Sequence, residues 1–127
     1  MTRLFIAINA VLFLGFGILI VTHAAIVFQN MGFGDLGSNA LYEVRSNYGG
    51  VSLGIGLFCA YAVFKSKLQR PALFVLMIYM GGYALGRILA LPFEGVPSAT
   101  MMAYGLLEAV VAVLAFALLR SGKSSSQ

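Results

Sequence analysis

Four long apolar stretches, separated by short polar or turn-forming segments, constrain this sequence more than any other feature. They cover about residues 4–28, 40–64, 71–91 and 98–119, and each approaches or exceeds the roughly 20 apolar residues with which a helix crosses a bilayer. Only 9% of the 127 residues are charged, whereas soluble domains are about a quarter charged. We therefore predict an all-α integral membrane four-helix bundle with four transmembrane spans, formed as a single domain over residues 1–127.

The segments between the apolar stretches predict where the helices end. Residues 29–37 are rich in glycine and polar side chains and predict a loop. Residues 65–70 end the second helix, and Pro71 suits the first turn of the third, where its missing amide costs nothing. A turn is predicted over residues 92–97. After the fourth helix, residues 120–127 predict a flexible, solvated tail.

The charged residues predict an orientation. A four-span topology places most basic residues on one side of the membrane and most acidic residues on the other, and the basic side is the cytoplasmic one. Both termini are therefore predicted to be cytoplasmic. The first apolar stretch exceeds the 7 to 15 residues of a signal-peptide core, so we expect an uncleaved first span. The basic side carries Arg3, Lys65, Lys67, Arg70, Arg120 and Lys123, and the acidic side carries Asp35, Glu43 and Glu94 with Arg45.

Glycines recur in the second and third apolar stretches as two similar clusters. Each cluster has a glycine pair and a GxxxG spacing, and the topology places both in the outer half of the bilayer. Small residues let membrane helices approach closely. We predict that spans two and three pack through these glycines, while a dimer interface through the same residues stays open. The predicted packing residues are Gly49, Gly50, Gly54, Gly81, Gly82 and Gly86.

Arg87 and Glu108 are ionisable residues within predicted spans. A charge in the middle of a span costs about 2.5 to 3.5 kcal/mol on insertion scales, so each residue needs a partner or a water-filled site. Two arrangements are open: a neutralised ion pair that sets helix rotation and register, or an outward-facing pocket whose arginines bind an anion. The predicted intramembrane polar cluster comprises Arg45, Asn47, Tyr48, Arg87 and Glu108, with His23 as a peripheral candidate.

The sequence predicts no metal site, no cofactor and no catalytic residues. A metal site needs three or four ligands, but the chain has one histidine, His23, and one cysteine, Cys59. A membrane enzyme would ordinarily require paired histidines, paired cysteines or a second buried acid. We therefore expect a protein that is not an enzyme.

A short ordered motif opens the apolar part of the second stretch. Residues 43–50 read Glu-Val-Arg-Ser-Asn-Tyr-Gly-Gly, and residues 54–56 read Gly-Ile-Gly. This motif resembles the signature of bacterial membrane proteins called the domain of unknown function 4345 family. The resemblance implies four helices and no established activity, and His23 is not part of its pattern. Further along the chain, the family's remaining marks are matched by Gly86, Arg87, Gly95 and Glu108.

These observations predict a small, non-enzymatic protein of the bacterial inner membrane, acting as an accessory, assembly or lipid-interacting component. The alternative is a small transporter or ligand-binding membrane protein with a polar pocket in the outer leaflet. The expected partners are membrane lipids, and both a homo-oligomer and a larger membrane complex are open. The net charge of +4 does not indicate nucleic acid, because the basic residues flank apolar segments.

Overall fold

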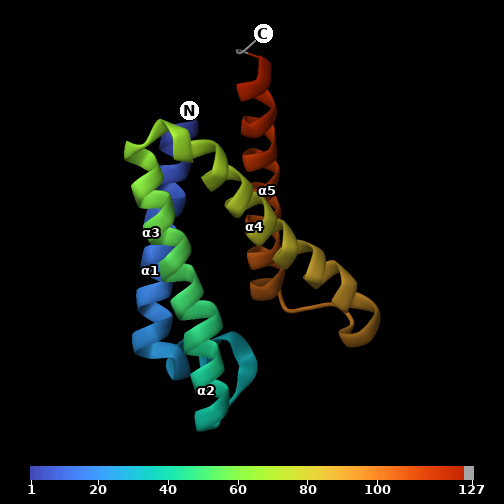
Figure 1. Ribbon diagram of the computed structural model, residues 1–127. Helices are drawn as coiled ribbons and strands as arrows, with labels where there is room; N and C mark the ends of the chain where they lie inside the picture. Colours follow the sequence, from blue (N-terminus) through green and yellow to red (C-terminus); the bar gives the residue numbers. More distant parts are fainter. Residues whose placement is uncertain (125–127) are drawn as a thin grey trace. The chain divides into compact units, whose positions relative to one another are not determined.

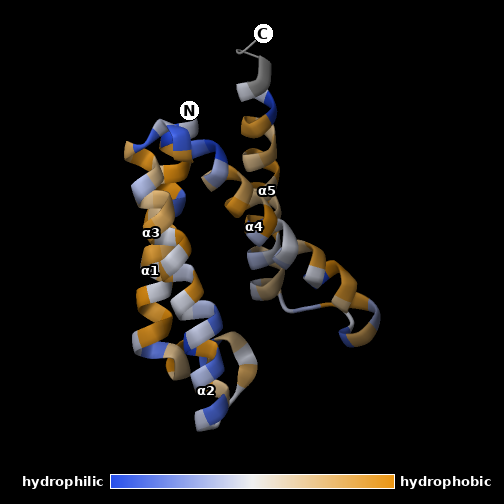
Figure 2. Cartoon of the chain, in the orientation of Figure 1, coloured by the Kyte–Doolittle hydropathy of each residue, from blue (hydrophilic) through white to orange (hydrophobic). Residues whose placement is uncertain are grey.

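A computed structural model describes residues 1–124, and nearly all of them are helical (Figure 1). Four helical segments are long and apolar enough to cross a membrane: Thr2–Phe33, Ser38–Phe64, Ser66–Glu94 and Ala99–Gly122. Figure 2 shows hydrophobic colours over long parts of these helices, while the region of α2 is largely hydrophilic or neutral. Residues 1–124 contain no strand. The predicted all-α fold with four spans is confirmed, and the chain is a multi-pass membrane protein.

Two of the four spans contain π-helical segments, in which each backbone hydrogen bond spans one residue more than in an α-helix. One segment extends the first span, and the other lies within the second span, which we take as Ser38–Phe64. In chain order, the elements are α1 (Thr2–Phe28), η1 (Gln29–Phe33), α2 (Ser38–Val44), η2 (Arg45–Gly50), α3 (Val51–Phe64), α4 (Ser66–Glu94) and α5 (Ala99–Ser124).

Helical structure continues through several positions where the sequence predicts a loop, a turn or a tail. The predicted loop over residues 29–37 shortens to residues 34–37, because η1 follows α1 without a break. The predicted tail is wrong for residues 120–124, which belong to α5, and residues 125–127 lie outside the described part. Lysine, arginine and glutamine are good helix formers, so a helix can continue beyond its apolar section.

Both prolines near the ends of α4 lie inside the helix. Pro71 is not in the first turn, because α4 already begins at Ser66. The predicted turn over residues 92–97 is wrong for its first part, since Pro92 is helical and α4 ends at Glu94. Membrane helices tolerate proline where neighbouring groups satisfy the freed carbonyl. Gly95 ends the helix instead: its φ is +75°, and its amide donates to the Leu91 carbonyl at 3.0 Å.

The chain divides into two compact units, Met1–Gln69 and the part from Arg70 onward. The first unit contains α1, η1, α2, η2 and α3. The second contains α5 and all of α4 after its first residues. The single domain predicted from the sequence stays a prediction, as does the side of the membrane on which the termini lie.

In the first unit, α1 packs antiparallel against the second span, with a glycine at each of three close contacts. A Cβ atom added at Gly17 or Gly56 would lie 2.9 Å from a backbone nitrogen of the other helix, closer than real Cβ atoms come. The contacts are spaced by three and then four residues along both helices, so they follow one face of each. The pairs are Leu14 with Gly56, Gly17 with Leu53, and Val21 with Gly49.

The six glycines predicted to join spans two and three have different surroundings within their own units. Gly49 contacts α1, and a Cβ added at Gly81 would lie 3.6 Å from the Cβ of Ala112 in α5. The packing of span two on span three through glycines stays a prediction. An added Cβ would have no contact closer than 3.8 Å at Gly50 and none within 4 Å at Gly54, Gly82 or Gly86.

Candidate functional site

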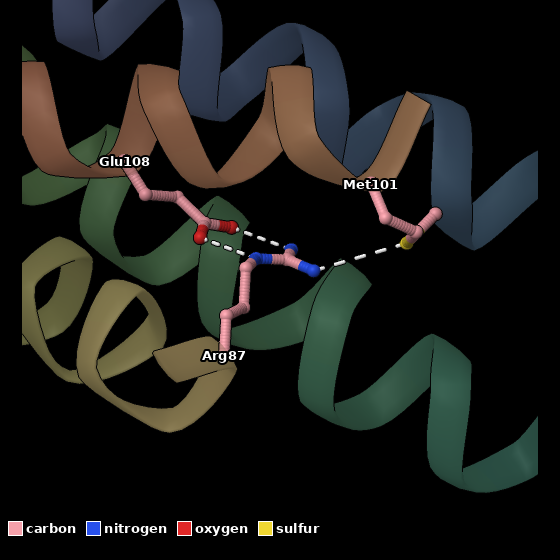
Figure 3. A network of polar contacts seen from close by, with 3 residues as sticks. All are labelled: Arg87, Met101 and Glu108. Carbon is pink, nitrogen blue, oxygen red and sulfur yellow. Dashed lines mark hydrogen bonds and ion pairs between the residues drawn. The ribbon is translucent and has the colours of Figure 1, made fainter. Parts of the chain in front are cut away.

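Arg87 of α4 and Glu108 of α5 form a two-point ion pair in the second unit (Figure 3). The Nε atom of Arg87 donates to Oε2 of Glu108 at 2.6 Å, and Nη2 donates to Oε1 at 2.8 Å. The arginine side chain is 35% exposed and the glutamate side chain 12%. Paired, charge-assisted hydrogen bonds of this kind are among the strongest in proteins. Of the two arrangements open from the sequence, the structure contains the ion pair.

One face of α5 accommodates the guanidinium of Arg87. Met101, Gly105 and Glu108 are spaced by four and three residues, which places them on the same side of the helix. The Nη1 atom of Arg87 lies 3.8 Å from the sulfur of Met101, and an added Cβ at Gly105 would lie 3.1 Å from Cδ of Arg87. Met101 and Gly105 are not among the site residues predicted from the sequence. Their helical spacing from Glu108 was the signal that could have found them.

Two tyrosines lie on the α4 face that carries Arg87. Tyr79 and Tyr83 are two turns and one turn before Arg87, and their hydroxyl oxygens are 3.2 Å apart. Their rings meet edge to face, with centroids 4.9 Å apart. These phenols extend the polar surface of α4 away from the ion pair, and they place two fluorescent groups near it.

Arg45 in the first unit binds a backbone carbonyl of α1. Its Nη1 atom donates to the carbonyl oxygen of Val21. Two residues further on, His23 has non-helical dihedral angles, φ −128° and ψ 32°, which kink α1. A kink disturbs the backbone hydrogen bonds of the adjacent turn. Arg45 therefore joins the second span to α1 beside an irregular turn.

His23 has a local partner at this kink. The Oγ1 atom of Thr22 lies 2.7 Å from Nδ1 of His23 and also donates to the carbonyl of Ile18 at 2.7 Å. In the part of the chain that the structure describes, no group of three histidine, cysteine, aspartate or glutamate side chains could hold a metal ion. The geometry thus gives His23 a local hydrogen bond at the bend in α1.

Asn47 and Tyr48 also have interactions within the first unit. The side-chain amide of Asn47 donates to Oε2 of Glu43 at 2.9 Å, one turn earlier in the same span. The ring of Tyr48 meets the ring of Phe28 edge to face, with centroids 5.4 Å apart. Both residues lie in η2 with Arg45, and π-helical segments of this kind are frequent at functional sites.

The residues that resemble the family signature lie in two of these places. The motif at residues 43–50 includes all of η2, and Arg87 and Glu108 form the ion pair. Residues 1–119 match the family described as domain of unknown function 4345. The chain belongs to this family. In this DUF4345 protein, the match extends from the first residue to the last turns of α5. No curated protein and no solved structure matches the chain.

The predicted polar cluster of this DUF4345 protein is distributed over the two units. Arg87 and Glu108 bind each other in the second unit. The other three members follow one another in η2 of the first unit, where they bind Val21, Glu43 and the Phe28 ring. A single polar layer that combines all five residues stays a prediction.

Proposed function

We propose that this protein is a non-enzymatic membrane component with an accessory, assembly or lipid-interacting role. The closed ion pair between Arg87 and Glu108 carries the proposal. Both carboxylate oxygens of Glu108 accept hydrogen bonds from the same guanidinium, so the two charges neutralise each other. A neutralised pair inside an apolar environment sets helix register, whereas acid–base chemistry or anion capture needs a group that is available to the substrate.

The apolar surface of the spans supports the same role. Large hydrophobic side chains are exposed along every span, for example Leu57 in α3, Ile88 in α4 and Leu106 in α5. Lipid tails are as apolar as these side chains, so such surfaces are compatible both with lipid and with other membrane helices. In this proposal the polar residues hold the helices, and the apolar faces make the contacts that matter for function.

A small transporter or ligand-binding protein is the alternative function. The observation that favours it is the 35% exposure of the Arg87 side chain, which leaves part of a cation accessible beside Glu108. In this alternative an anion displaces Glu108 from the guanidinium.

Tyrosine fluorescence distinguishes the two functions, because the chain has six tyrosines and no tryptophan. Purified protein in phospholipid vesicles is titrated with acetate and with inorganic phosphate. The fluorescence of Tyr79 and Tyr83 should respond to a change at the ion pair, because both lie on the face of α4 that carries Arg87. We expect no saturable change in fluorescence. A saturable change that disappears in Arg87→Gln would contradict the proposed function and support the alternative.

The proposed topology places both termini in the cytoplasm and assigns the protein to the inner membrane of a bacterium. In a background in which buried Cys59 is replaced by serine, single cysteines are introduced at Ser66, Ser124 and Ser38. We expect a membrane-impermeant maleimide to label Ser66→Cys and Ser124→Cys only from the cytoplasmic side. Ser38→Cys should be labelled only from outside, and the opposite pattern would overturn the topology.

A further inference from the structure

A shallow hollow of about 190 Å³ lies in the second unit, where α4 begins and α5 ends. Its walls are aromatic and aliphatic, and an arginine from each helix stands beside them. This is the end of the helices that the proposed topology assigns to the cytoplasmic leaflet. The hollow is lined by Arg70, Phe74, Met77, Phe116, Leu119 and Arg120. We call it the arginine hollow.

The two arginines are held over the apolar walls by the protein itself. The guanidinium of Arg70 lies 5.7 Å from the ring centre of Phe74, and the guanidinium of Arg120 lies 5.9 Å from that of Phe116. Arg70 also donates from Nη1 to the carbonyl of Leu119 at 3.4 Å, which ties α4 to α5. Each guanidinium is thus positioned at the rim of the hollow.

These two positive charges have no acidic partner among residues 1–124. The one ion pair in that part of the chain joins Arg87 to Glu108, at other positions along α4 and α5. A guanidinium carries five N–H donors, and Arg70 uses one of them on Leu119. Two arginines with donors remaining, at the edge of a membrane span, are suited to an anion that binds through paired oxygens.

We propose that the arginine hollow binds an anionic phospholipid, with the headgroup phosphate on Arg70 and Arg120 and the first part of an acyl chain along the apolar walls. This inference rests on the proposed lipid-interacting role. Enclosed pockets for small molecules measure about 300 to 1,000 Å³, so the hollow is too small for a whole ligand. A lipid needs no enclosure, because the rest of its tails stay in the bilayer.

Charge selects an anionic lipid over a zwitterionic one. Lys65 and Lys67 lie five and three residues before Arg70 along the chain, and they add positive charge next to Arg70. Basic pockets between membrane helices on the cytoplasmic side are a common form of anionic-headgroup site. The ammonium group of a zwitterionic headgroup would be repelled by this positive charge. It could not bind the faces of the two phenylalanine rings either, because guanidinium groups already cover them.

Native mass spectrometry of the full-length protein tests the proposal, with phosphatidylglycerol and phosphatidylcholine added to the detergent at equal concentrations. We expect the wild type to retain phosphatidylglycerol preferentially. Arg70→Gln/Arg120→Gln should lower the apparent affinity for phosphatidylglycerol roughly thirtyfold, since each basic residue near an anionic lipid contributes a factor of about five. Arg70→Lys/Arg120→Lys keeps both charges and should retain most of the binding, provided that the protein is folded.

The matched control is Lys65→Gln/Lys67→Gln, which removes the same charge from residues that shortly precede Arg70 in the chain but do not line the hollow. An equal loss in this control would show a general attraction to anionic surfaces and overturn the site.

Competition by inorganic phosphate at the concentrations of the lipid would assign the arginines to free phosphate instead. If phosphatidylglycerol binding survives in Arg70→Gln/Arg120→Gln, the site is wrong but the lipid-interacting role stands. If no lipid is retained by any variant, both fail.

Discussion

Glu108→Gln is expected to lower the free energy of unfolding in detergent by about 3 to 5 kcal/mol, because it leaves the Arg87 guanidinium without its counter-charge. Arg87→Gln should cost a similar amount, since it strands a carboxylate that is only 12% exposed. The double variant Arg87→Gln/Glu108→Gln removes both charges and should recover part of the loss. Denaturation of the purified protein in mixed micelles measures all three free energies.

The double-mutant cycle is informative because the two residues contact each other directly, and contacting residues are not additive. Strictly additive losses would contradict a direct pair. Glu43→Gln is the matched control: Glu43 is exposed and accepts a hydrogen bond from Asn47 one turn away in its own span. We expect this control to change the free energy of unfolding by less than about 1 kcal/mol.

The alternative function predicts a different pattern for the same variants. If Arg87 binds an anion, Glu108→Gln removes a competing carboxylate and should raise the affinity for acetate or phosphate. Arg87→Gln should then abolish binding with little loss of stability. Stability and anion affinity measured on one set of variants therefore separate a structural pair from a binding pocket.

Gly56→Ala is expected to destabilise the protein by about 1 to 3 kcal/mol, as overpacking of a close contact does. Its new Cβ would lie 2.9 Å from the backbone nitrogen of Leu14 and 2.7 Å from Cγ of that leucine. A backbone atom cannot turn aside as a side-chain tip can, so α1 and α3 must separate. Reversible unfolding in detergent measures the loss, which should appear despite the better helix propensity of alanine.

Gly54→Ala is the matched control for Gly56→Ala, because an added Cβ at Gly54 meets no atom within 4 Å. This variant should be neutral or stabilising by up to about 1 kcal/mol through helix propensity alone. Equal losses at Gly54 and Gly56 would contradict the observed contact between α1 and α3. A loss in Gly54→Leu, with the α1 contact intact, would instead support the GxxxG packing predicted for spans two and three.

The glycines show where sequence patterns stop being informative. The GxxxG spacing of Gly50 and Gly54 is a local pattern, and it indicates only that one face of the helix lacks large side chains. Which glycine-bearing face contacts another helix depends on the rotation of the partner helix. In the first unit that rotation brings Leu14 against Gly56 and Leu53 against Gly17, and neither glycine is among the predicted packing residues.

The part of the candidate site that follows from the free-energy cost of an unpaired charge in an apolar span was predictable from the sequence. Arg87 and Glu108 are opposite charges inside apolar spans, and the cost of leaving either unpaired predicts that they need partners. The contact of Arg45 with Val21 could not be predicted in the same way. Its acceptor is a backbone carbonyl beside the kink at His23, and no side-chain pattern marks such a carbonyl.

The sequence by itself determined the helical class and the number of spans. Four apolar stretches of bilayer length leave the backbone no alternative to internal hydrogen bonding, so each must form a helix. Tertiary structure alone decided which residues meet: the glycines at the contact of α1 with α3, the carbonyl that Arg45 binds, and the two-point geometry between Arg87 and Glu108. The physical reason is that hydropathy acts on each segment separately, whereas these contacts depend on how two helices are rotated and aligned against each other.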